Sequence, residues 1–189
     1  MEFRDLNEQE IECRVQSSGE QKDANTLWAR VILYKGARVD MNLLDEVVGR
    51  ENWQRDHKEL KGNMYCGIGI NINYLDDNKE PYWVWKWDCG AESFTDKEKG
   101  EASDSFKRAG VNWGIGRELY TKIPITIFGL PKNYKGNVDG TFCVEKIKIE
   151  NKEITALSLM FKQTNKNEFL RCFIWTKEEG IKYCSYKGE

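Results

Sequence analysis

The chain has 189 residues, of which 32% are charged and 12% aromatic, and its formal net charge is -2. This length suits one domain with its own core, and the aromatic content excludes a wholly disordered chain. No uncharged apolar run approaches the roughly 18 residues that suggest a membrane-spanning helix. The first residues are acidic rather than apolar, so no signal peptide is predicted.

Charge is distributed unevenly along the chain. Residues 1–26 hold seven acidic and three basic side chains, a net charge of -4, so the remaining residues carry +2. A site for an anion therefore has to be a local patch rather than a basic surface. The six cysteines lie far apart in the sequence, which excludes a zinc knuckle or a redox pair and predicts reduced thiols in a cytoplasmic protein.

The first predicted elements alternate between helix and strand. Residues 5–17 are predicted to form a short acidic helix and residues 18–26 a loop. Leu27 to Tyr34 is rich in β-forming side chains, which predicts a strand. From Ala37 to Val48, apolar side chains recur at steps of three and four, which predicts a helix that ends at Gly49.

Three strands are predicted next, as a hairpin or meander, at residues 53–60, 65–73 and 81–89. In the second strand, isoleucines alternate with Gly67 and Gly69, so the glycine face leaves room for another backbone or a ligand. The same region is rich in aromatic side chains, namely Tyr65, Tyr74, Tyr82, Trp83, Trp85 and Trp87. Most of them are expected in the core, where aromatic rings pack, although exposed rings would form a platform for stacking bases.

A second helix is predicted from Asp96 to Trp113, with an apolar stripe at steps of four and three. The chain beyond Pro124 is β-rich, with strands near 141–149, 154–162 and 168–175. The predicted fold class is therefore α+β, with an antiparallel sheet packed against helices and a β-rich C-terminal extension. The predicted organisation is an acidic segment at 1–26, a core at 27–120, and an extension at 121–189 within the same domain.

Cationic side chains on the second helix form the strongest candidate site. Lys99, Lys107 and Arg108 could contact a sugar–phosphate backbone, where they would neutralise phosphates without reading sequence. Asp104 is within helical reach of Lys107 and of Arg108, so it either orients one of them or forms a surface ion pair. The alternative interpretation is an ordinary amphipathic helix with a solvated charged face.

A second candidate lies at the junction between the first strand and the first helix. Lys35 and Arg38 flank the start of that helix, whose N-terminus also favours an anion. The alternative is a solvated turn. No metal-ligand or phosphate-loop motif is found, and the single histidine, His57, excludes chemistry that needs several histidines.

Two blocks of sequence resemble the Rad-fifty-two-type single-strand annealing proteins, including their phage relatives of the Sak type. One block is Lys-Gly-Glu-Ala-Ser-Asp-Ser-Phe-Lys-Arg-Ala at 99–109, followed by Trp113 to Tyr120. The other runs from Ala37 to Gly49 and is followed by Asn52-Trp53. The blocks occur in the family's order, and the resemblance covers about residues 27–120.

The resemblance implies a phage-encoded protein of a bacterial cytoplasm that anneals single-stranded DNA without ATP, cofactor, metal or catalytic residue. It implies a ring or filament of identical subunits, with a single-strand-binding protein or a recombination exonuclease as further partners and no membrane. Lys107, Arg108, Lys99 and Arg38 match the family's DNA-backbone contacts. Some members carry a further basic residue where this chain has Val111, and Lys35 or Arg117 would compensate for it.

Two alternative functions remain open at this point. The abundant carboxylates are compatible with a metal-dependent nuclease. A cluster of acidic side chains brought together by the fold would support that hypothesis. An interaction module for recombination or replication would instead use the acidic N-terminal segment or the β-rich extension, and would have no affinity for nucleic acid.

Overall fold

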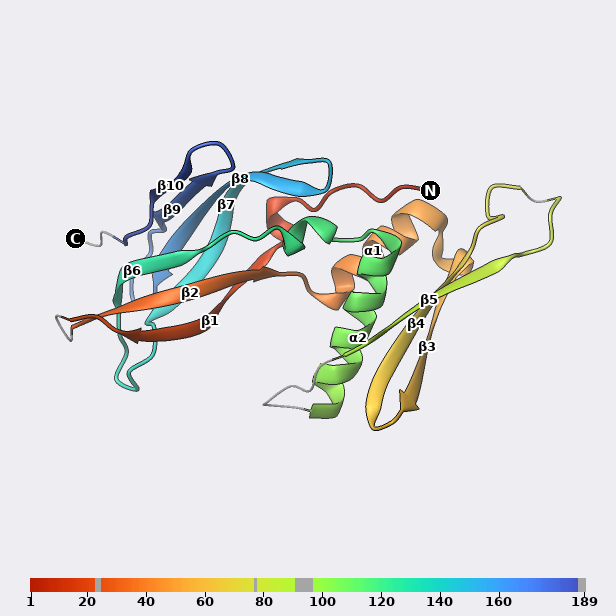
Figure 1. Ribbon diagram of the computed structural model, residues 1–189, viewed down its shortest axis with the longest axis horizontal. Helices are drawn as coiled ribbons and strands as arrows, with labels where there is room; N and C mark the ends of the chain where they lie inside the picture. The colour runs from red at the N-terminus through yellow and green to blue at the C-terminus, as the bar shows by residue number, and fades with distance from the viewer. Residues whose placement is uncertain (23–24, 77, 91–96, 187–189) are drawn as a thin grey trace. The chain divides into compact units, whose positions relative to one another are not determined.

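A computed structural model describes residues 1–22, 25–76, 78–90 and 97–186 (Figure 1). The chain divides into two compact units, each built from two separate stretches. Unit 1 contains residues 1–5 and 36–116, and unit 2 contains residues 6–35 and 117–189. Both units are built on antiparallel sheets, which confirms the predicted α+β class.

Unit 1 is a three-stranded sheet with two helices. Its strands are in the order β3-β4-β5. Its elements are α1 (Ala37–Val48), a 3-10 turn (Arg50–Asn52), β3 (Trp53–Leu60), β4 (Asn63–Asn71), β5 (Trp83–Cys89) and α2 (Lys97–Trp113). The two helices and three strands confirm the elements that the sequence predicts for this region.

Helix α1 has the predicted bounds because its apolar face is well defined. Asp40, Leu43, Leu44 and Val48 are buried, at steps of three and four residues that place them on one helical face. The helix ends at Gly49, where φ is 84° and the amide donates to the Asp45 carbonyl oxygen over 3.1 Å. A positive φ is accessible to glycine without strain, which explains why the helix stops there.

Helix α2 packs on one face of the sheet, against β4 and β5 (Figure 1). Ile68 and Ile70 of β4 are fully buried, as are Phe106 and Ala109 of α2. The helix also meets α1 at Gly110, where a Cβ atom would lie 2.2 Å from Oδ1 of the buried Asp40. The two helices can approach this closely only because position 110 has no side chain.

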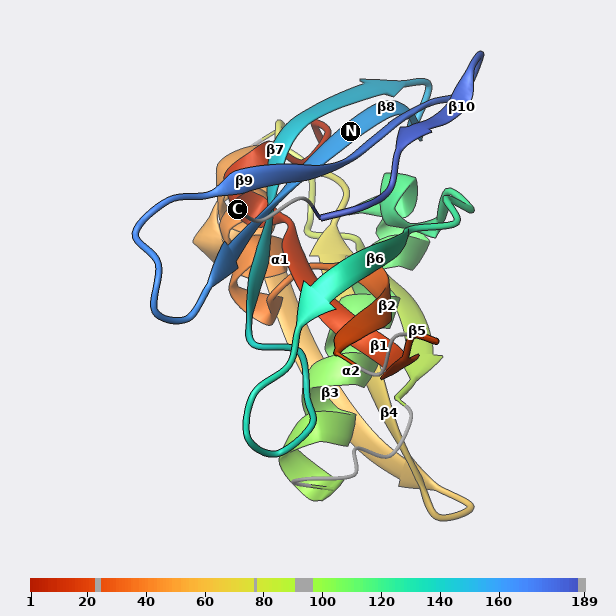
Figure 2. The same cartoon turned by 90° about the vertical axis from the view of Figure 1, so that its left-hand side faces the viewer.

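Unit 2 is a seven-stranded sheet in the order β10-β9-β8-β7-β1-β2-β6. The sheet curls on itself (Figure 2), and Phe128 of β6 pairs with Ser185 beyond β10. The curled sheet encloses a core in which the Phe161 ring packs against Phe142 and Tyr186. Its strands are β1 (Glu12–Glu20), β2 (Thr26–Tyr34), β6 (Thr126–Pro131), β7 (Gly140–Glu150), β8 (Glu153–Gln163), β9 (Leu170–Thr176) and β10 (Gly180–Tyr183).

The N-terminal region differs from its prediction. The expected helix over 5–17 is wrong, since only a 3-10 turn at Glu8–Glu10 precedes β1. Strand β1 pairs with β2 along nearly its whole length, so tertiary pairing overrides a weak local pattern. The expected loop at 18–26 is correspondingly shorter. The division of the chain at residues 26 and 120 stays a prediction.

Among the residues that the structure describes, no helix has the length and apolar character needed to span a membrane.

Candidate nucleic-acid interface

Helix α2 carries Lys107 and Arg108, the basic pair that the sequence singles out. Both side chains are partly exposed, 27% for Lys107 and 42% for Arg108. Lys99 lies in the first turn of the same helix, and its side chain is outside the part that the structure describes. Neighbouring positions on a helix are separated by about 100°, so Lys107 and Arg108 cover two adjacent sides of α2.

Each member of the pair has a carboxylate partner. The Lys107 ammonium lies 3.9 Å from Asp104, one helical turn away, as the sequence allowed. Arg108 instead contacts Asp88 of β5, with its Nε and Nη2 both 3.2 Å from the same carboxylate oxygen. These partners limit the rotamers of two long cationic side chains while leaving part of each head group in solvent.

A polar network surrounds the Arg108–Asp88 contact. The Asn112 side-chain amide donates to the Trp87 carbonyl oxygen over 3.1 Å and lies 3.5 Å from the second Asp88 oxygen. Asp88 is only 23% exposed, so its carboxylate is partly shielded from water. A fixed, half-buried carboxylate can hold the guanidinium in one orientation beside the edge of the sheet.

Lys86 is a further cation beside Arg108, and it lies outside the motifs of the sequence. Its ammonium donates to the Asn112 carbonyl oxygen over 2.9 Å and lies 4.3 Å from the Trp113 ring centroid. Lys86 and Asp88 are two residues apart on β5, so both point to the face that α2 covers. The sequence pattern that could have identified Lys86 is the alternation of side chains along β5, which places Lys86 on the face opposite the three tryptophans.

Arg38 is exposed in the first turn of α1 and forms no ion pair with any residue that the structure describes. Its helix meets α2 through Asp40 and Gly110. Arg38 and Asp40 are two residues apart, which is a rotation of about 200° around the helix axis. The Arg38 side chain therefore points away from the contact between α1 and α2. The structure therefore places Arg108 and Lys86 at the contact between α2 and β5. Lys107 lies on an adjacent side of α2, and Arg38 lies in the same unit on α1.

Lys35 and Arg117 belong to unit 2. Lys35 is 4% exposed, which leaves little of its ammonium for an external ligand. Arg117 opens a 3-10 turn, Arg117–Tyr120, and is exposed. Of the two residues proposed to compensate for Val111, Arg117 is the accessible one.

The expectation that most of the strand aromatics enter the core is wrong. None of the six is buried, and Tyr82 is 61% exposed. The tryptophans of β5 project from the face opposite α2, where the indoles of Trp85 and Trp87 lie over Gly69 and Gly67. Because α2 takes the isoleucine face of the sheet, the rings occupy the space above the glycines instead.

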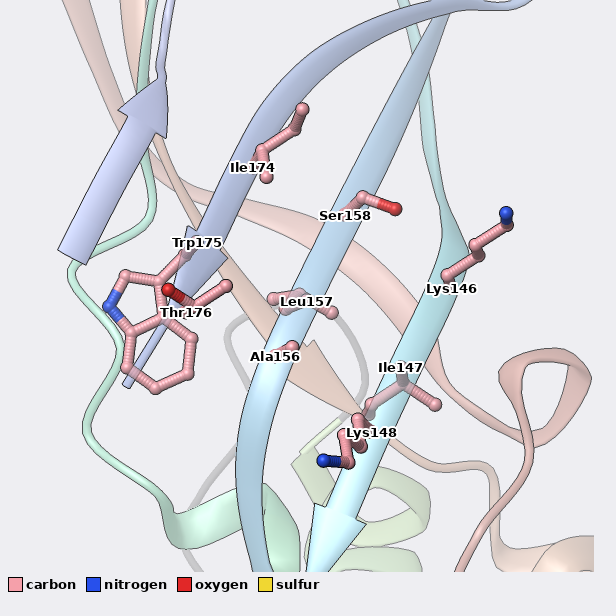
Figure 3. A pocket seen from close by; sticks show the side chains of 9 residues that line it. All are labelled: Lys146, Ile147, Lys148, Ala156, Leu157, Ser158, Ile174, Trp175 and Thr176. Atoms are coloured by element: carbon pink, nitrogen blue, oxygen red, sulfur yellow. The ribbon is translucent and has the colours of Figure 1, made fainter. Parts of the chain in front are cut away.

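A hollow in unit 2 offers no comparable arrangement. It measures about 320 Å³ and crosses β7, β8 and β9 (Figure 3). Lys146 and Lys148 of β7 contribute to it, but its other lining side chains carry no charge, and Lys148 forms an ion pair with Glu150 over 2.7 Å. In the residues described, no group of three or more His, Cys, Asp or Glu could hold a metal ion, so the acidic cluster that a nuclease predicts is not found there.

Comparison with known protein families matches residues 3–126 to the family described as Rad52/22 family double-strand break repair protein. The matched stretch is about two thirds of the chain, and it includes α1, the three-stranded sheet and α2. Comparison with curated proteins and with solved structures found no match.

Proposed function

Because the chain belongs to the Rad52/22 family of double-strand break repair proteins, which act in recombination by annealing DNA strands, we propose that it binds single-stranded DNA and pairs complementary strands without ATP. The observation that supports this most directly is the basic pair Lys107 and Arg108 on α2, joined by Lys86 from β5. The three cations belong to unit 1, and Arg108 and Lys86 both lie at the contact between α2 and β5.

The chemistry of this arrangement suits a DNA backbone rather than a base sequence. Lysine and arginine heads neutralise phosphates, and the counterions released on binding supply affinity for any sequence. The bases then remain available to a complementary strand, whose pairing supplies both the specificity and the driving force. The protein acts by reducing the repulsion between two polyanions, and no covalent bond is made or broken.

The remaining details of the proposal come from the family and the earlier resemblance. We propose a ring or filament of identical subunits, because one small subunit offers only a short track for a strand. A phage origin, a bacterial cytoplasm as the place of action, and a single-strand-binding protein or exonuclease as partner complete the proposal. Arg38, Lys99 and Arg117 are proposed as further backbone contacts.

The decisive experiment is the double substitution Lys107→Ala/Arg108→Ala, tested for binding and annealing of labelled oligonucleotides without ATP. Two lost phosphate contacts should weaken binding at least tenfold and reduce the slope of log affinity against log salt by about 1.4. Annealing should fall in parallel, because the strands are no longer held.

The matched control is Lys177→Ala/Lys182→Ala, which removes two exposed, ion-paired cations from unit 2. It should bind and anneal like the wild-type protein. Unchanged annealing in the Lys107/Arg108 variant would contradict the proposal, and strand cleavage that depends on a divalent metal would favour a nuclease.

A further inference from the structure

Unit 1 contains a hollow of about 430 Å³ beside the C-terminal end of α2. It is lined by Met1, Ile72, Tyr74, Leu75, Lys86 and Trp113. Leu75 is 84% exposed, Met1 is 56% exposed and Ile72 is 45% exposed, so three large apolar side chains at this hollow face solvent. A small set of apolar, aromatic and cationic side chains around one concavity is typical of a ligand site.

Lys86 gives the hollow a fixed positive charge. Its ammonium is held between the Asn112 carbonyl oxygen, 2.9 Å away, and the Trp113 ring, whose centroid is 4.3 Å away. Trp113 is itself fixed, because its indole nitrogen donates to the Ile68 carbonyl oxygen over 3.0 Å. An ammonium with this backbone and ring support is positioned for an anion without much loss of side-chain entropy.

The hollow continues the line of cations that begins on α2. Arg108 contacts Asp88, and Asn112 links Asp88 to Lys86, so this chain of contacts lies entirely within unit 1. Lys86 and Asp88 lie about 7 Å apart along β5, since each residue of a strand advances about 3.3 Å. A polyanion bound at Arg108 therefore has its next positive partner at the mouth of the hollow.

We propose that this hollow is a nucleotide subsite for single-stranded DNA, in which Lys86 binds a phosphate and one nucleobase lies among Tyr74, Leu75 and Trp113. This inference rests on the proposed function and adds a base contact to a track that otherwise binds only backbone. A nucleobase suits the hollow because it combines a flat apolar face with a polar edge, and aromatic contacts to bases tolerate any sequence.

The phosphate contact is tested with Lys86→Met, which keeps most of the hydrocarbon that packs on Trp113 and removes the charge. Lys58→Met is the matched control, because the Lys58 ammonium also lies over a tryptophan ring, 4.4 Å from the Trp87 centroid, but on the other face of the sheet. Lys86→Met should bind oligonucleotide several-fold more weakly, with a salt slope smaller by about 0.7, whereas Lys58→Met should match the wild-type protein.

The base contact is tested with Leu75→Glu, using an intact oligonucleotide and one in which abasic sites replace alternate nucleotides. Leu60→Glu, at an exposed position at the far end of β3, is the control. The wild-type protein and Leu60→Glu should prefer the intact strand. Leu75→Glu should lose most of that preference, because the acidic side chain occupies and charges the hollow. Both positions are more than half exposed, so the fold should tolerate either change.

The outcomes separate this inference from the proposed function. If the wild-type protein binds no single-stranded DNA, the proposed function is wrong and the subsite falls with it. If the wild-type protein binds but Lys86→Met behaves like Lys58→Met, only the phosphate contact of the subsite is overturned. An unchanged preference for the intact strand in Leu75→Glu overturns the base contact.

Discussion

The guanidinium of Arg108 is held by an anion of the protein itself. Asp88 accepts from both Nε and Nη2, and this fixes the direction of the head group before any ligand arrives. The same carboxylate, however, repels a phosphate that approaches Arg108. With the ion pair partly exposed, its contribution to folding is small, so its main effect is on the local charge.

Asp88→Asn should therefore tighten the binding of single-stranded DNA at low salt. The amide oxygen can still accept from Arg108, while the local charge rises by one unit, so the salt slope should steepen by up to about 0.7. Titration of a labelled oligonucleotide at several salt concentrations measures this. Glu153→Gln, which neutralises a carboxylate paired with Lys177 in unit 2, is the control. Weaker binding by Asp88→Asn would show that orientation of Arg108 matters more than charge.

At the scale of elements, β4 and β5 form a pair in which small and large side chains match across the strands. Gly69 lies opposite Trp85 and Gly67 lies opposite Trp87. The two indoles are stacked, with ring centroids 5.7 Å apart and planes inclined by 23°. A Cβ atom at position 69 would lie 2.7 Å from the Trp85 ring, so the glycine is what allows the ring to lie flat on the strand.

Gly69→Ala should destabilise the protein by about 1–3 kcal/mol, because the added methyl group displaces the Trp85 ring. In the variant Gly69→Ala/Trp85→Leu the penalty of the methyl group should be much smaller, since the clashing ring is gone. Chemical denaturation of the wild type, both single variants and the double variant measures the coupling. Additive effects would mean that the ring and the glycine do not interact.

Some of the helices and strands could be predicted from local sequence patterns, and others could not. Helix α1 and the strands β3 to β5 were predictable because their apolar periodicity is strong and local. Strands β6 and β10 are short, and β1 has mostly polar side chains, so their pairing depends on distant partners. The positions of Lys107 and Arg108 on α2 were predictable from the helix alone, and their contact with DNA stays a prediction. The contacts of Asp88 and Lys86 with α2 were not predictable, because they depend on how β5 packs against that helix.

At the scale of the whole molecule, three thiols report on the two units, of which Cys66 and Cys172 are buried and Cys13 is half-buried. Burial raises the pKa of Cys66 in unit 1 to about 11, and raises the pKa of Cys13 and Cys172 in unit 2 to about 12. An ordinary thiol has a pKa near 9.0, and only the thiolate reacts readily. At pH 8, these three thiols are therefore far less reactive in the native state than after unfolding.

Alkylation at pH 8 should consequently follow the opening of each unit. Because each unit has its own core, Cys66 should be protected to a different degree from Cys13 and Cys172, which should react together. Mass spectrometry of peptides after timed alkylation in low urea measures the three rates. A single common rate for all three thiols would mean that the chain unfolds as one cooperative body.

Because each unit is built from two separate stretches of sequence, the order of the stretches affects both folding during synthesis and the effect of truncation. Strand β2 pairs with β1 on one side and with β6 on the other, and β1 pairs in turn with β7. During synthesis on a ribosome, unit 1 has all its segments once residue 116 has emerged, whereas the first hairpin of unit 2 must wait for strands translated much later. A fragment of residues 27–120 would contain β2 but neither of its neighbours, β1 and β6. Libraries of truncated chains should therefore yield no stably folded fragment that contains β2 and lacks both of these strands.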